Sequence, residues 1–84
     1  MLVEDVKQTI RDFIIGNFFF GNPPEAFRDN ASFLDRGLID STGILELIEF
    51  IEATYDIGVA EDELTPENLD SVDRVSAFVI RKVS

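Results

Sequence analysis

The sequence has no cysteine, no histidine and no tryptophan among its 84 residues. Without cysteine the chain can form neither a disulfide framework nor a thiolate metal site. Without histidine it lacks both the commonest general base and the commonest metal ligand, so a serine nucleophile would have nothing to activate it. The abundant carboxylates would be exposed and poorly placed for acid–base work on so small a chain. We therefore expect this protein not to be an enzyme.

The sequence also argues against two kinds of binding site, a calcium loop and a phosphate-binding loop. Twelve-residue calcium windows that start at Asp29 or Asp56 put apolar residues or glycine at ligand positions, for example Ala31 and Gly58. A glycine-rich phosphate loop is missing as well. No metal site is predicted.

Bases are scarce and unevenly placed. Seven Lys and Arg residues face seventeen Asp and Glu residues, which gives a net charge of −10. No base lies between Gly37 and Asp73, although that stretch holds most of the acids. Nucleic acids and anionic membranes would be repelled by such a surface, whereas a basic patch on a partner protein would be attracted. A face that merely keeps a monomer soluble is the alternative.

Long apolar runs are absent too. No stretch approaches the ~20 residues that span a bilayer, and the first residues lack a basic segment followed by an apolar one. A soluble, cytoplasmic protein is the expectation. The length predicts one domain over residues 1–84, and a hydrophobic content of 45% is ample for a folded core.

Helical spacing of apolar residues predicts a first helix over about Val3 to Ile15, with a stop at Gly16-Asn17. A segment of unusual length then runs to Asp40 and contains Pro23-Pro24. Its apolar residues predict an ordered loop that packs over the helices, although a binding patch at its start is the alternative. These residues are Phe18, Phe19, Phe20, Phe27, Phe33, Leu34, Leu38 and Ile39.

A second helix is predicted to begin at Asp40-Ser41, where either residue can cap the first turn. Its buried stripe comprises Ile44, Leu47, Ile48, Ile51 and Tyr55. The opposite face is acidic around one exposed leucine, Leu45, which suits a docking site for a partner. Phe50 fits neither face and is expected to contact the long loop.

A short third helix is predicted after Thr65 as cap, with Pro66 in its first turn. The last helix opens at Asp70-Ser71 and buries Val72, Val75, Val79 and Val83, with Phe78 beside them. The predicted fold is all-α, a small four-helix bundle of three main helices and one short one.

The residues around Ser41 resemble those of acyl and peptidyl carrier proteins. In that family a short approach ending in Asp-Ser enters a helix, and Glu-Leu follows five and six residues after the serine. Asp40-Ser41 and Glu46-Leu47 stand at that spacing within the segment from Phe33 to Leu47. Tyr55 to Val59 resembles the family's helix end, and Leu64 to Val72 resembles its short third helix.

The resemblance implies that Ser41 receives 4′-phosphopantetheine from coenzyme A through a magnesium-dependent phosphopantetheinyl transferase. The thiol of this arm then carries an acyl or aminoacyl cargo as a thioester. Asp40 is similar to the acidic neighbour that helps to position the transferase's metal. The docking face for partner enzymes would comprise Thr42, Leu45, Glu46 and Glu49, with Glu61, Asp62 and Glu63 beside them.

Three residues depart from the fatty-acid carriers. Thr42 stands where leucine or methionine is usual, Glu49 stands at an often apolar position, and Gly43 softens the first turn at a cost of about 1 kcal/mol. The sequence around Ser41 is more similar to that of stand-alone carriers. An adenylating ligase loads such carriers, and they deliver the cargo to acyl-processing enzymes. The competing hypothesis is a non-covalent acidic adaptor that binds a basic partner, with Ser41 only a helix cap.

Overall fold

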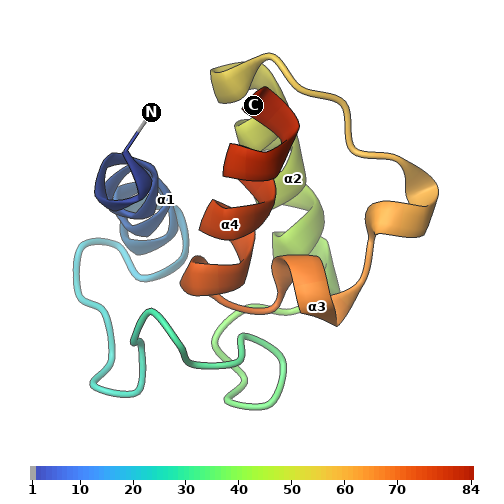
Figure 1. Cartoon of the computed structure of the whole chain (residues 1–84). Coiled ribbons are helices and arrows are strands. Elements are labelled where there is room, and N and C mark those ends of the chain that lie inside the picture. The colour runs from blue at the N-terminus through green and yellow to red at the C-terminus, as the bar shows by residue number, and fades with distance from the viewer. Residues whose placement is uncertain (1) are drawn as a thin grey trace.

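The computed structural model describes residues 2–84, and every regular element in that range is a helix, with no strand. Figure 1 shows the arrangement of its elements. They are α1 (Val3–Phe18), α2 (Ser41–Tyr55), a 3-10 helix η1 (Glu61–Glu63), α3 (Pro66–Leu69) and α4 (Val72–Val83). The predicted all-α bundle, with three main helices and a short third one, is confirmed.

The core lies where α1, α2 and α4 meet. Helix α4 packs along α1 and against α3, and α2 contacts both α1 and α4. Apolar residues at helical spacing supply most of the buried side chains, as the periodicity predicts. Val83, predicted to be buried, is instead partly exposed at the last turn of α4. The core residues include Val6, Ile10, Ile14, Phe33, Ile39, Leu47, Ile51, Leu69, Val72, Val75, Phe78 and Val79.

Two of the three predicted N-terminal helix caps form a capping hydrogen bond. The side chain of Asp40 accepts a hydrogen bond from Gly43 N, and Ser71 accepts one from Arg74 N. Thr65 occupies the cap position of α3, but its hydroxyl makes no capping bond. The predicted stop of α1 at Gly16 is wrong, because the helix continues to Phe18.

The true end of α1 is a left-handed turn. Phe20 has φ +52° and Gly21 has φ +88°, and Gly21 N donates to Ile15 O. A bulky residue in this region is unusual, and Phe20 places its side chain in solvent with 85% exposure. The expected packing of the loop is therefore wrong for Phe20 and for half-exposed Leu34.

The rest of the α1–α2 loop is packed as predicted. Phe33 and Ile39 are buried, and Phe18, Phe19, Phe27 and Leu38 pack against the core. Phe50, which was expected to contact the long loop, stacks on Phe13 of α1, with ring centroids 4.1 Å apart.

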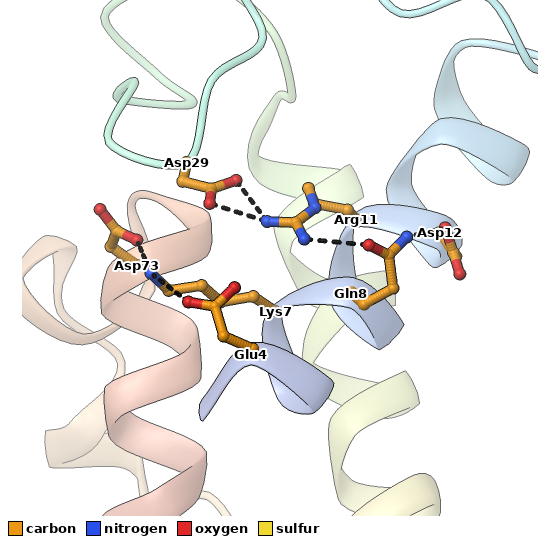
Figure 2. A network of polar contacts seen from close by, with 7 residues as sticks. All are labelled: Glu4, Lys7, Gln8, Arg11, Asp12, Asp29 and Asp73. Carbon is orange, nitrogen blue, oxygen red and sulfur yellow. Dashed lines mark hydrogen bonds and ion pairs between the residues drawn. The ribbon is translucent and has the colours of Figure 1, made fainter. Parts of the chain in front are cut away.

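An ion pair joins the middle of the loop to α1, and a second ion pair joins α1 to α4 (Figure 2). Arg11 of α1 donates to both carboxylate oxygens of Asp29, at 2.8 and 2.7 Å. Asp73 N donates to Asp29 O at 2.9 Å, and the Asp73 carboxylate lies 2.9 Å from Lys7 Nζ. The hydrogen bond to Asp73 raises the pKa of Lys7 above its ordinary value of 10.5.

Asp70 holds the end of the loop. Its carboxylate accepts hydrogen bonds from Ser32 Oγ and from Leu34 N, and its carbonyl accepts one from Phe33 N. The segment that leads into α2 is thereby attached to the junction of α3 and α4.

Ser76 offers a test of the core. Its side chain is fully buried in α4, and its hydroxyl has no hydrogen-bond partner within residues 2–84. Because an unsatisfied buried polar group is costly, Ser76→Ala is expected to raise the free energy of unfolding by about 1 kcal/mol. Urea unfolding followed by circular dichroism measures the change.

Ser71→Ala is the matched control in the same helix, since Ser71 caps α4. It is expected to lower the free energy of unfolding by about 1 kcal/mol. A loss of stability in both variants would contradict the assignment of Ser76 as unsatisfied.

Candidate functional site

Ser41 is the first residue of α2, and its side chain is exposed. Asp40 precedes it in an extended conformation, and Asp40 Oδ1 accepts from Gly43 N at 2.8 Å. The first amide bonded within the turn is Ile44 N, which donates to Asp40 O at 2.9 Å. Within residues 2–84 the Ser41 hydroxyl and the amides of Ser41 and Thr42 have no hydrogen-bond partner.

This arrangement fits a phosphate group on the hydroxyl. Free amides and the positive end of the helix dipole favour an anion at a helix start. Because Asp40 caps Gly43, the amides of Ser41 and Thr42 remain available to phosphate oxygens. The Ser41 side chain also has open solvent in front of it, so an extended arm meets no obstruction there.

Gly43 allows the close packing behind Ser41. A Cβ on Gly43 would overlap Ile39 Cγ2 and lie 3.1 Å from the Phe18 ring. Ile39 is buried and β-branched, so it has little freedom to move away. From the sequence, Gly43 is expected only to weaken the helix. The structure shows that it is needed for the approach of α2 to the end of α1.

The predicted docking residues of α2 share one exposed face. Thr42, Leu45, Glu46 and Glu49 are all exposed, with Leu45 at 56%. Neither glutamate forms an ion pair with any residue that the structure describes. The face therefore carries unneutralised negative charge around an apolar residue.

The acidic run of η1 is divided in its contacts. Glu61 and Asp62 are exposed and form no ion pair within the described chain. Glu63 accepts from Ala60 N and from Lys82 Nζ, both at 2.9 Å. The bond from Ala60, followed by that from Lys82, lowers the pKa of Glu63 below its ordinary value of 4.5. Glu63 thus fastens η1 to α4, a role that its place in an acidic run did not indicate.

An open, apolar groove of about 170 Å³ lies between α2 and α3. It begins at Ile44 and Leu45, one turn beyond Ser41. Sequence reasoning missed it because α3 has only four residues, too few to show a periodic face. The groove is lined by Leu34, Ile44, Leu45, Ile48, Leu64, Thr65, Pro66, Leu69 and Asp70.

Other site types are not found in the part of the chain that the structure describes. Residues 2–84 contain no group of three or more acidic side chains arranged to hold a metal ion. No helix in the same range is long and apolar enough to cross a membrane.

The packing at Gly43 predicts an unusual response to alanine. Gly43→Ala gains about 1 kcal/mol of helix propensity, but overpacking against Ile39 costs about 1–3 kcal/mol. We expect a net loss of about 1 kcal/mol in the free energy of unfolding. Equilibrium urea unfolding measures it.

Gly16→Ala is the matched control, because Gly16 lies inside α1 with nothing within 4 Å of its added Cβ. It is expected to stabilise the protein by up to about 1 kcal/mol. Equal stabilisation by the two substitutions would mean that Gly43 is not needed for close packing.

One of two comparisons with known proteins finds a related sequence. A scan against protein-family models finds no match. A D-alanyl carrier protein from Abiotrophia defectiva is 36% identical over 50 residues, which cover 60% of this chain and 63% of that relative. The chain thus spans less than two thirds of the relative's length. The sequence match, together with the all-helical fold, supports a carrier protein family for this chain.

Proposed function

We propose that this protein is a carrier whose Ser41 holds 4′-phosphopantetheine derived from coenzyme A. The observation that carries the proposal is the exposed Ser41 hydroxyl at a capped helix start whose first amides are free. In the transfer, Ser41 Oγ forms the new bond to phosphorus, 3′,5′-ADP leaves and the hydroxyl proton passes to a base. The bound arm supplies the thiol that this cysteine-free chain lacks.

Asp40 has two tasks in this proposal. Its Oδ1 caps the helix and keeps the Ser41 backbone in place. Its other carboxylate oxygen has no hydrogen bond within residues 2–84, and Asp40 is exposed. We assign that oxygen to the magnesium ion of the phosphopantetheinyl transferase.

The exposed face of α2 is the proposed docking site for the transferase, for an adenylating ligase and for downstream acyl-processing enzymes. Leu45 would enter an apolar recess of the partner, while Glu46 and Glu49 would meet its basic residues. Thr42, Glu61 and Asp62 extend this surface, with Glu63 at its edge. The carboxylates of this surface other than Glu63 form no ion pair within the described chain, so they can steer a basic partner over a distance.

The proposed cargo is a small amino acid or carboxylic acid. The name of the relative refers to D-alanine, and a groove of about 170 Å³ that is open to solvent offers little shelter for a long chain. An adenylating ligase would activate such a cargo and transfer it to the thiol of the arm.

Intact-protein mass spectrometry tests the attachment. After incubation with coenzyme A, magnesium and a broad-specificity phosphopantetheinyl transferase, the wild-type mass is expected to rise by one phosphopantetheine. Ser41→Ala is expected to gain nothing, because it lacks the attacking oxygen.

Ser84→Ala removes an exposed serine elsewhere and is expected to gain mass like the wild type. If the folded wild type gains no mass with several transferases, the carrier proposal is wrong. If the Ser41→Ala variant then still binds its basic partner, the protein is the acidic adaptor instead, and Ser41 is only a helix cap.

A further inference from the structure

Two arginines stand apart from the other bases of this acidic chain. Arg28 and Arg36 are exposed, and their side chains make no hydrogen bond or ion pair to any residue that the structure describes. Each remaining base contacts a partner within the chain. Lys7 and Arg11 belong to the network of Figure 2, and Arg74, Arg81 and Lys82 contact Pro66 O, Asn68 Oδ1 and Glu63.

Both free arginines line the same hollow. It lies within the α1–α2 loop, has a volume of about 370 Å³ and is also lined by Asn30 and Ser32. Asp35 lines it too, but forms no ion pair with either guanidinium. The chain thus places its two arginines with unpaired side chains around one polar depression, which suits a carboxylate or phosphate.

The hollow lies at the Ser41 end of the molecule. Figure 1 shows the loop running across the end of the bundle where α2 begins. A second polar hollow shares Asn30, Ser32 and Asp35 with the first. That second hollow also shares Leu34, Pro66 and Asp70 with the apolar groove beside Leu45. A continuous surface therefore leads from the arginines to the start of α2.

The charge of the protein decides which anion fits. A net charge of −10 repels free phosphate or carboxylate ions from solution. An anionic side chain on a partner that is already docked on α2 is held close by, so its effective concentration overcomes this repulsion. The occupant that the charges favour is a carboxylate of a bound protein.

The location of the hollow, at the end of the bundle where α2 begins (Figure 1), decides which partner supplies the carboxylate. An adenylating ligase reaches its target through the arm, whereas the phosphopantetheinyl transferase must bring its active site to the Ser41 hydroxyl itself. Its surface must therefore cover the surroundings of Ser41. We propose that Arg28 and Arg36 form a basic contact that receives a carboxylate of the transferase, opposite in sign to the acidic face of α2; this rests on the proposed function.

Two contacts of opposite sign fix the orientation of a docked enzyme. A single acidic face allows a basic partner to bind in several rotations, but any rotation that misplaces the second contact puts like charges together. The arginines thus select the orientation that presents Ser41 to the active site.

The test is the initial rate of arm transfer as a function of carrier concentration, for wild type and for Arg28→Gln with Arg36→Gln. Two exposed ion pairs of 0.2–1 kcal/mol each correspond to a rise in KM of about two- to thirtyfold, with kcat unchanged. Arg28→Lys with Arg36→Lys should stay within about twofold of wild type. Because neither arginine has a partner in the fold, thermal melting should not change.

Leu2→Glu with Ala77→Glu is the control for net charge, since both residues are exposed and neither lines the hollow. It adds the same negative charge and should leave KM near the wild-type value. An unchanged KM in the glutamine variant, or an equal rise in the control, would overturn the inference while transfer itself still occurred. No transfer to any variant would overturn the proposed function as well.

The source of the anion is settled by dephospho-coenzyme A as donor. If the enzyme supplies a carboxylate, the effect of the glutamine variant on KM should persist with this donor. Loss of the effect would assign the anion to the 3′-phosphate of coenzyme A and overturn the contact with a protein side chain.

Discussion

The close approach of α2 to the end of α1 at Gly43 is the contact on which the position of Ser41 depends. A side chain at Gly43 would overlap Ile39, and the Phe18 ring lies against the same spot. Asp40 Oδ1 accepts a hydrogen bond from Gly43 N. The first turn of α2 is therefore held by packing and by its cap, which leaves the Ser41 hydroxyl and the amides beside it directed to solvent.

The long α1–α2 loop is anchored to the helices. Asp29 joins it to α1 through Arg11 and to α4 through Asp73 N, and Asp70 holds the segment before α2. The acidic side chains in these contacts are paired with basic side chains or backbone amides of the same chain. The acids of the α2 face have no such partners in the described chain, so the charge imbalance of the sequence is concentrated where a partner would dock.

The sequence alone predicts much of this arrangement. Helical periodicity predicted the helices, and the cap residues Asp40 and Ser71 predicted where two of them begin. Local patterns failed where distant contacts decide the outcome. Gly16 looks like a helix stop, yet α1 continues, and Gly43 looks like a weakness until Ile39 is placed beside it. The pairing of Glu63 with Lys82 and the grouping of Arg28 with Arg36 likewise depend on the folded chain.

Loading of the modified protein is the most direct measurement of the whole account. The phosphopantetheine-bearing form is incubated with ATP, D-alanine and an adenylating ligase specific for that amino acid, and its intact mass is recorded. The account predicts a gain of one alanyl group that hydroxylamine removes, as expected of a thioester, and no gain in Ser41→Ala. Failure to load any small acid from a panel of ligases, with long fatty acyl chains accepted instead, would contradict it.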